Sequence, residues 1–271
     1  MAPDVDAWQS CLAVHKMVLT PAEHYDAWLR LAAVCRLNRR HHLCRKAIEE
    51  LVGPLKHVMN NKETWLRVHP KVALAWVKHR WEMGKKIEAL ATLDSIVDSA
   101  QGDAQTRARC CVKQGQWTLE LNDWMLDEAV APKVHASFHA ATQVNPKWCK
   151  AWHNLGLFNF EMVAFYEKQD QPAKVAPHLV PAISCFYQSI SLQRTHHTQQ
   201  DILRLLTIWF KYGAQSDVAL ALDYAVAQLS IDTWLEVVPQ IIARINLPEA
   251  RVRSSIHDLL FRIGLQHPQA P

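Results

Sequence analysis

Apolar residues in this chain recur at the spacing of paired helices, and this pairing leaves few folds open to it. Trp28, Leu31 and Cys35 share one helical face, because residues three and four apart lie on the same side of a helix. Neither of two such helices can cover its own apolar stripe, so the two must pack together as a hairpin. The predicted core positions of this first hairpin, on either side of a polar break at residues 36–42, are Trp28, Leu31, Ala32, Cys35, Cys44, Ile48 and Leu51.

The same pattern returns further along the chain, with Gly84 marking the turn of a second hairpin. The apolar positions of this hairpin are Ala73, Trp76, Val77, Ala89, Leu93 and Ile96.

The register of the repeat can be checked between residues 134 and 156. A tetratricopeptide repeat pairs two antiparallel helices and ends in a proline, and a tryptophan opens the next repeat. Pro146 fits the closing position, and Trp152 stands six residues later, where the pattern requires it. The remaining matches are Val134, Phe138 and Ala141 before the proline, Leu155 and Gly156 after the tryptophan, and Ala182, Phe186 and Ile190 on the next helix.

Residues 167–181 separate the last two helices of this pattern. The segment is polar and contains three prolines. We interpret it as an insertion in the loop between the helices, because loops tolerate extra length at little free-energy cost.

Helical periodicity continues beyond Asp201 without the tryptophan pattern, and predicts further hairpins over residues 201–271. The whole chain is therefore predicted to be an all-α solenoid of tetratricopeptide-like hairpins, with about a dozen helices and no sheet. The apolar stripes of this part are Leu203, Leu206, Trp209 and Phe210; Val218, Leu222, Ala225 and Leu229; Trp234, Val237, Ile241 and Ile245; and Val252, Ile256, Leu259 and Ile263.

Composition agrees with this architecture. Seven glycines occur among 271 residues and no Asn-Gly or Asp-Gly pair is present, which disfavours β-hairpins. The net charge of +4 is too small to indicate a nucleic-acid partner by itself. The seven cysteines form no Cys-x-x-Cys pair, so we expect small buried side chains in a reducing compartment, not a zinc site. No signal peptide and no apolar run of about 18 residues is seen, so a cytoplasmic location is expected, with endomembrane association or nuclear entry only as part of a complex.

Literal sequence strings add a family resemblance. The segment TWLEVVPQIIARINLPEARVRSSIHDLLFRIGLQHPQA, residues 233–270, resembles the C-terminal part of the FAT region in phosphatidylinositol-3-kinase-related kinases. The target-of-rapamycin branch is indicated by collinear matches over nearly the whole chain. These are DAWQSCLAVHKMVLTPAE (6–23), DAWLRLAAVCR (26–36), HPKVALAWVKHRW (69–81), ARCCVKQGQW (108–117) and KWCKAWHNLGLFNFE (147–161).

The resemblance implies a domain organisation. Residues 1–271 would be a FAT-type helical region, with tetratricopeptide-like repeats over 1–200 and helical hairpins over 201–271. The rapamycin-binding and kinase domains that follow in the family would be absent. This chain would be a non-enzymatic scaffold that supports the kinase domain and contacts the other subunits of the kinase complex.

Catalytic signals are weak. A kinase needs a glycine-rich phosphate loop and metal-binding and catalytic aspartates, yet no two glycines are closer than Gly102 and Gly115, and no Asp-Phe-Gly occurs. The pairs His41–His42 and His196–His197 are expected in exposed polar connectors without further ligands. Ser254–Ser255 lacks the flanking glycines of a hydrolase nucleophile. The eleven tryptophans fall mostly on repeat positions, so packing is favoured over a peptide-binding role.

Basic residues gather in the first two thirds of the chain. Arg36 and Arg40, like Arg109 and Lys113, are four residues apart, so each pair is expected to project from one helical face. Lys78 and Lys150 fall on first-helix positions that face the concave groove of such repeats. Solvated helix faces or a phosphate-binding groove would both explain this pattern.

FAT regions of the resembled family hold inositol hexakisphosphate in a Lys/Arg pocket. The resemblance carries that role, as a structural cofactor site, onto Arg40, Lys78, Lys85, Arg109, Lys113 and Lys150, with Lys86 as an alternative to Lys85.

Two other functions stay open at this stage. A free-standing repeat protein would use the basic groove to bind acidic peptides, and would need a polar capping helix at each end. The last predicted helix, 252–263, keeps an apolar stripe, which favours a piece of a longer array. An enzyme with an unrecognised site is the third function, and no convergent acid, base or nucleophile supports it.

Overall fold

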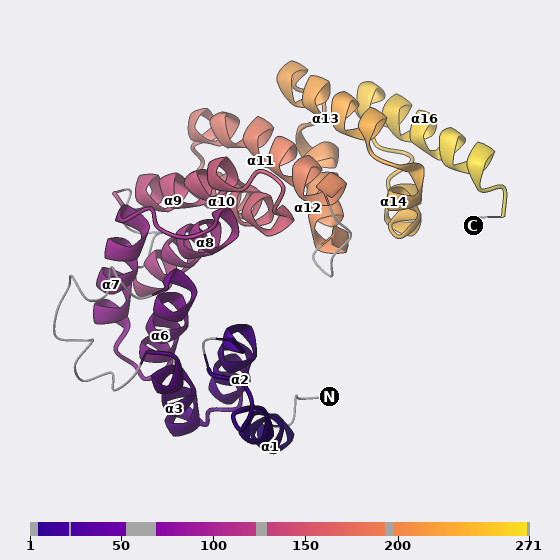
Figure 1. Ribbon diagram of the computed structural model, residues 1–271. Helices are drawn as coiled ribbons and strands as arrows, with labels where there is room; N and C mark the ends of the chain where they lie inside the picture. Colours follow the sequence, from indigo (N-terminus) through magenta and orange to yellow (C-terminus); the bar gives the residue numbers. More distant parts are fainter. Residues whose placement is uncertain (1–4, 22, 53–68, 123–128, 193–197, 270–271) are drawn as a thin grey trace. The chain divides into compact units, whose positions relative to one another are not determined.

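The computed structural model describes residues 5–21, 23–52, 69–122, 129–192 and 198–269. Within them the chain is entirely α-helical, with successive helices packed as hairpins (Figure 1), which confirms the predicted fold class. The fourteen helices of this part are α1 (Val5–His15), α2 (Tyr25–Leu37), α3 (His41–Val52), α6 (Pro70–Glu82), α7 (Lys86–Asp98), α8 (Ala104–Leu121), α9 (Val130–Val144), α10 (Cys149–Lys168), α11 (Pro172–Leu192), α12 (Thr198–Tyr212), α13 (Ser216–Gln228), α14 (Ile231–Leu235), α15 (Val238–Ile242) and α16 (Ala250–Gln266).

The helices form two compact units, residues 1–137 and 138–271. In the first unit, α2 packs on α3, α6 packs on α7, and α6 also contacts α2 and α8. The predicted positions Trp28, Cys35, Ile48, Val77 and Leu93 are all buried in this unit.

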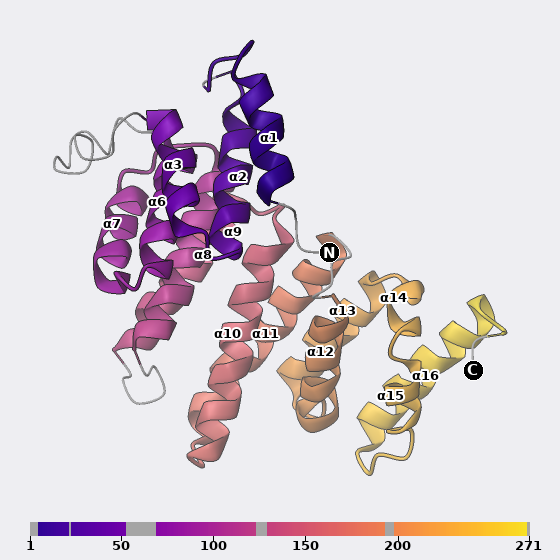
Figure 2. The same ribbon diagram turned by 90° about the horizontal axis from the view of Figure 1, so that it is seen from below.

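In the second unit, α10 and α11 lie side by side along their length, as Figures 1 and 2 both show. Gly156 on α10 faces Phe186 on α11, and a Cβ added at Gly156 would lie only 3.0 Å from that ring. The tryptophan and proline of the predicted register are in contact here, because the Trp152 indole Nε1 donates to the carbonyl oxygen of Pro146 over 2.8 Å.

Three of the hairpins have the same type of turn. In the α2–α3, α6–α7 and α10–α11 connections, three residues separate the helices and the middle one has positive φ: Arg39 at 57°, Gly84 at 81° and Asp170 at 53°. In each turn the N–H of the following residue donates to a carbonyl five residues earlier, as in Arg40 to Cys35 over 2.8 Å. This Schellman geometry satisfies carbonyls that the end of a helix leaves unpaired, and it reverses the chain in few residues.

The predicted loop insertion at residues 167–181 is wrong, because the α10–α11 connection is a short turn of this same type. Helix α11 begins at Pro172, and Pro177 and Pro181 lie inside it. A proline inside a helix removes one backbone hydrogen bond. Here the side chains of Val175, Leu179 and the following core residues keep the segment helical by packing into the unit. The second helix of this hairpin is therefore one long helix, α11, and the α10–α11 connection is no longer than those of the other two hairpins.

Four other sequence predictions differ from the structure. Leu203 is 36% exposed and is not a core residue, and Ile245 is only half-buried. The stripe from Trp234 to Ile245 belongs to two short helices and the turn after them, not to one helix. Of the seven cysteines, Cys11 is exposed and the other six are buried, and none of the seven forms a disulfide.

Tryptophans mostly serve packing, as predicted. Six of the described indoles are buried, and those of Trp81 and Trp117 stack with ring centroids 4.2 Å apart. Trp65, Trp124 and the pair His196–His197 lie outside the described residues. The buried six are Trp28, Trp76, Trp81, Trp117, Trp209 and Trp234.

A buried polar network ties three helices of the second unit together. The carboxylate of Asp201, on α12, is fully buried. It accepts hydrogen bonds from His153 Nδ1 on α10 over 2.8 Å, from Ser189 Oγ on α11 over 2.9 Å, and from Arg204 over 3.3 Å. A buried charge is tolerated only when its partners are in place, so this network fixes the relative positions of α10, α11 and α12.

Changing Asp201→Ala is expected to lower the free energy of unfolding by about 3–5 kcal/mol, because two buried polar partners lose their acceptor. Urea denaturation followed by circular dichroism measures this loss. Asp223→Ala is the matched control, since Asp223 forms an exposed ion pair with Arg251 at 3.4 Å and its loss should change stability by about 0–1 kcal/mol. Equal effects of the two substitutions would contradict a structural role for the network.

Gly84→Ala is expected to destabilise the chain by about 1 kcal/mol, because an L-residue at positive φ crowds its own backbone. No atom lies within 4 Å of a Cβ added at either Gly84 or Gly264, so contacts do not complicate the comparison. Gly264 lies inside α16, where alanine is the better helix former, and Gly264→Ala should stabilise by about 0.5–1 kcal/mol. Opposite signs in urea titrations are the expected result, and a shared sign would contradict the assigned turn geometry.

Candidate anion-binding site

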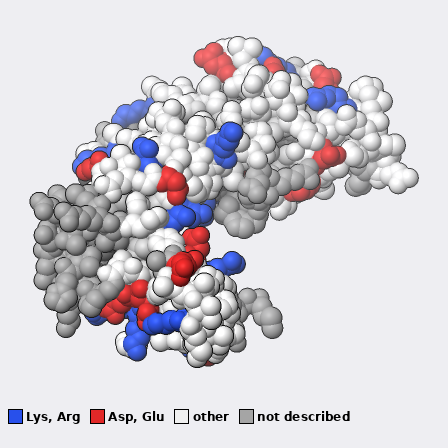
Figure 3. Space-filling model, viewed as in Figure 1, with Lys and Arg blue, Asp and Glu red and all other residues white. Residues whose placement is uncertain are grey.

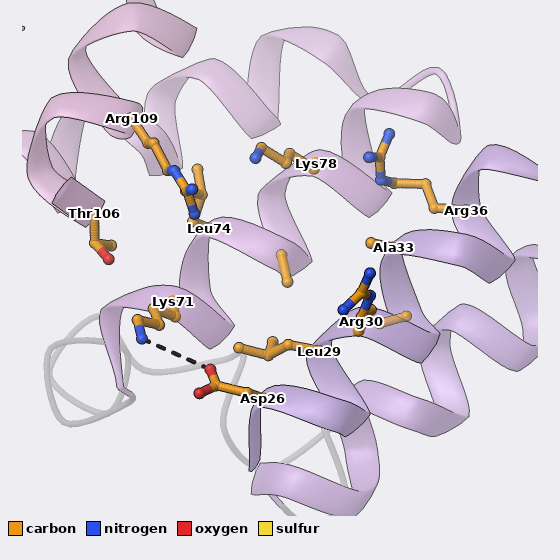
Figure 4. A pocket seen from close by; sticks show the side chains of 12 residues that line it. Asp26, Leu29, Arg30, Ala33, Arg36, Lys71, Leu74, Lys78, Thr106 and Arg109 are labelled. Carbon is orange, nitrogen blue, oxygen red and sulfur yellow. Dashed lines mark ion pairs between the residues drawn. The ribbon is translucent and has the colours of Figure 1, made fainter. Parts of the chain in front are cut away.

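A cavity of about 250 Å³ lies in the first unit, between α2, α6 and the first turns of α8. Figure 4 shows Arg30 and Arg36 on the α2 side and Lys71, Lys78 and Arg109 on the side of α6 and α8. The residues that line the cavity are Asp26, Leu29, Arg30, Ala32, Ala33, Arg36, Lys71, Leu74, Ala75, Lys78, Thr106 and Arg109.

Hairpin packing explains why these side chains meet. Helices α2 and α6 are the first helices of two hairpins and each buries one stripe against its second helix, which leaves another face for the cavity. On α6, Lys71 and Lys78 are seven residues apart, two helical turns, and therefore project from one face. The start of α8 is fixed by Asp103, whose carboxylate accepts from the Thr106 N–H over 2.7 Å, a bond that lowers the pKa of Asp103.

Lys78 is the electrostatic centre of the cavity. Burial, and then the positive charges of Lys113, Arg36 and Arg109, lower the pKa of Lys78 to about 8. Within the part of the chain that the structure describes, no ion pair joins the Lys78 ammonium to a carboxylate. Several cations are thus held close together around an ammonium that has no carboxylate partner among the described residues, which favours binding of an anion.

Some of the other cations already have partners. Lys71 Nζ lies 3.7 Å from Asp26 Oδ1, and Arg36 pairs with Glu82 at 3.2 Å. The Arg30 guanidinium lies over the Trp8 ring, 5.6 Å from its centroid. The lining nevertheless contains five basic side chains and a single acidic one, Asp26.

Of the six residues that the sequence proposed, the structure brings three together. Lys78 and Arg109 line the cavity. Lys113 follows Arg109 by one turn of α8, and after burial its charge is the largest influence that lowers the pKa of Lys78, while its ammonium donates to Gln116 over 2.9 Å.

The other three lie elsewhere. Arg40 is in the α2–α3 turn, where it pairs with Asp6 at 2.6 Å, so the expectation that Arg36 and Arg40 share one helical face is wrong. Lys85 is exposed in the α6–α7 turn and does not line the cavity, and its alternative Lys86 pairs with Glu120 at 2.7 Å. Lys150 is exposed in the first turn of α10, in the second unit.

Sequence reasoning missed Arg30 and Lys71 as cavity residues. A signal was present, because Lys71, Ala75 and Lys78 are spaced as one helical face. That pattern alone does not show which neighbouring helix completes the site.

Other candidate chemistry finds little support. Among the described residues no group of three or more His, Cys, Asp or Glu side chains is placed to hold a metal ion. Ser189, Asp201 and His153 include the residue types of a hydrolase triad, yet the serine hydroxyl donates to the aspartate and not to the histidine. No base therefore activates that serine.

His41 is also not the exposed connector residue that the sequence predicted. It begins α3 and its ring lies 5.9 Å from that of His79, between centroids. Burial, and then the neighbouring positive charges, lower the pKa of His79 to about 4, which keeps this ring neutral near pH 7. His42 is exposed.

Comparison with known proteins identifies the class. The FAT domain model matches residues 1–207, and the chain therefore belongs to the FAT domain family. It is homologous to the FAT region of target-of-rapamycin kinases, within the phosphatidylinositol-3-kinase-related kinase family.

The relatives are long kinases. The chain is 33% identical to serine/threonine-protein kinase tor1 of Schizosaccharomyces pombe and to serine/threonine-protein kinase TOR of Arabidopsis thaliana, and 31% identical to serine/threonine-protein kinase mTor of Drosophila melanogaster. Each match covers 98% of this chain and 12% of the relative. The chain thus spans about an eighth of the length of these proteins.

Surface and hydropathy add two observations. Figure 3 shows Lys and Arg interspersed with Asp and Glu over the visible face, whose described residues therefore form no broad basic patch. None of the helices in the described ranges has the length and apolar character that crossing a bilayer requires.

Lys78→Met is expected to stabilise the unliganded chain at pH 7 by about 1–3 kcal/mol, because it removes a cation held in a desolvated, positively charged site. The folded state lowers the pKa of Lys78 from 10.5 to about 8, so folding is disfavoured while the unfolded state keeps the proton. Between pH 8 and 10.5 the native chain has already lost this proton, and its stability rises relative to that of the variant. Urea titrations at pH 7 and pH 10 should therefore show the advantage of the variant shrinking, and a constant difference would contradict the assigned environment.

Proposed function

We propose that the chain acts as a non-catalytic helical scaffold within a target-of-rapamycin-type serine/threonine protein kinase. The observation that carries this proposal is the collinear match over 98% of the chain to such kinases, in a region where the matched model is a FAT domain. A stack of hairpins suits this role, because each hairpin is held by its neighbours and presents its outer faces to other domains. The partners would be the rapamycin-binding and kinase domains and the other subunits of the kinase complex.

Within this scaffold, the basic cluster would bind inositol hexakisphosphate as a structural cofactor. Lys78, Arg109 and Lys113 would form its centre, since the charges of Lys113 and Arg109 both act on Lys78. The resemblance adds Arg40, Lys85 and Lys150, which belong to other turns and, for Lys150, to the second unit. A multivalent phosphate would replace mutual repulsion by charge-assisted hydrogen bonds.

Such a ligand would stabilise the fold by linkage. Phosphates bound by Lys78 and Arg109 would hold α6 against α8, so the ligand would favour the folded over the unfolded chain. A free ligand concentration one hundred times the dissociation constant adds about 2.7 kcal/mol to the free energy of unfolding. Binding would also favour the protonated form of Lys78 and raise its pKa towards the ordinary value.

A thermal melt with and without micromolar inositol hexakisphosphate tests the site. A clear rise in melting temperature is expected for the unmodified chain, and unphosphorylated inositol should give none. Lys113→Ala should abolish most of the rise because it removes a charge from the centre of the cluster. Lys150→Ala tests separately whether the second unit contributes.

The matched control is Lys133→Ala, which removes an exposed lysine of α9 that does not line the cavity. A cooperative melt that the ligand does not shift, or a shift that Lys113→Ala leaves intact, would remove the inositol polyphosphate from the proposed function and leave the scaffold alone.

A further inference from the structure

We propose that the cavity between α2, α6 and α8 binds an acidic peptide segment that inserts an apolar side chain between the basic residues. This peptide site overlaps the proposed inositol polyphosphate site, because Lys78 and Arg109 contribute to both, and the two ligands would therefore compete. The floor, the rim and the size of the cavity each favour such a ligand.

The floor is apolar. Leu29 and Ala33 of α2 and Ala75 of α6 are half-buried and reach the cavity, with Ala32 and Leu74 almost fully buried beneath. Figure 4 shows Leu29 and Ala33 next to the Arg30 side chain, and Leu74 below Arg109. An inositol polyphosphate has no apolar group for such a floor. A leucine-sized side chain would bury against it and gain the free energy of leaving water.

The rim is basic on both sides. Arg30 and Arg36 stand on α2, and Lys71, Lys78 and Arg109 stand on α6 and α8, against the one carboxylate of Asp26. Cations on two sides of an apolar floor complement a segment with carboxylates before and after an apolar residue. The excess of basic side chains favours a negatively charged ligand, and their position on both sides of the floor favours acidic residues on both sides of an apolar one.

The size and place of the cavity fit a peptide anchor. Its volume of about 250 Å³ is below the ~300–1,000 Å³ usual for whole small-molecule ligands. The cavity has space for one anchoring side chain and lies between the first helices of two hairpins. Helical repeat proteins typically bind extended ligands along surfaces formed by such successive repeats. The small Ala33 and Ala75 leave room for the peptide backbone above the floor.

The test uses the 271-residue chain and two fluorescein-labelled peptides in fluorescence polarisation at fixed ionic strength. The first is Asp-Glu-Asp-Leu-Glu-Asp-Glu, and the second has serine in place of leucine. We expect the leucine peptide to bind about fivefold more tightly, because only leucine uses the floor. Arg30→Glu combined with Lys71→Glu should weaken binding about tenfold.

Two further variants sharpen the result. Lys133→Glu combined with Lys147→Glu makes the same change in net charge at two exposed lysines outside the cavity, and should leave binding within about twofold. Ala33→Phe fills the floor without changing charge and should abolish the preference for leucine. Thermal melts check that each variant is folded, and because Ala33→Phe and the charge reversals act independently, one unfolded variant does not remove the test.

Equal binding of the two peptides, no binding by the folded chain, or equal losses in the two charge-reversal variants would each overturn the peptide site. The inositol hexakisphosphate melt is scored separately. A ligand-induced rise without peptide binding would leave the polyphosphate site standing and the peptide site refuted. Peptide binding without a ligand-induced rise in melting temperature would support the peptide site and refute the polyphosphate site.

Discussion

The pairing of two helices that are each apolar on one side is the constraint on which this structure depends. Neither α2 nor α3 can bury its own stripe, and the same holds for α6 with α7 and α10 with α11. The short Schellman turns at Arg39, Gly84 and Asp170 make the pairing antiparallel and close. Each hairpin then still has apolar surface to cover, which it does by packing on the next one, as α6 does on α2.

This packing also creates the charged site. With one face of each first helix buried against its partner, the cations of α2, α6 and α8 are directed to a shared cavity. Burial, and then the like charges around Lys78, lower the pKa of this lysine, so its protonated form is disfavoured in the folded chain. An anion is the natural counterpart, whether as a polyphosphate or as the carboxylates of a peptide. In either case the ligand would contact neighbouring hairpins together and couple its binding to their packing.

Conflicts between local preference and packing show which of the two is stronger. Pro177 and Pro181 predict a loop, yet the long contact of α11 with α10 keeps the segment helical. The missing hydrogen bonds are a local loss of a few kcal/mol, while the buried side chains from Val175 to Ile190 contribute over the whole helix. The buried Asp201 network is another long-range effect, because its partners Ser189 and His153 lie 12 and 48 residues earlier in the chain, on other helices.

The sequence by itself determined the helix faces, the hairpin register from Val134 to Trp152 and the family, because helical periodicity and literal motifs are local along the chain. It also identified Lys78, Arg109 and Lys113 as candidates. Only the tertiary structure decided that Arg30, Arg36 and Lys71 join Lys78 and Arg109 around a cavity, and that Arg40 turns away to Asp6. The physical reason is that a cavity is formed by side chains from separate helices, and their meeting depends on packing angles that no single segment encodes.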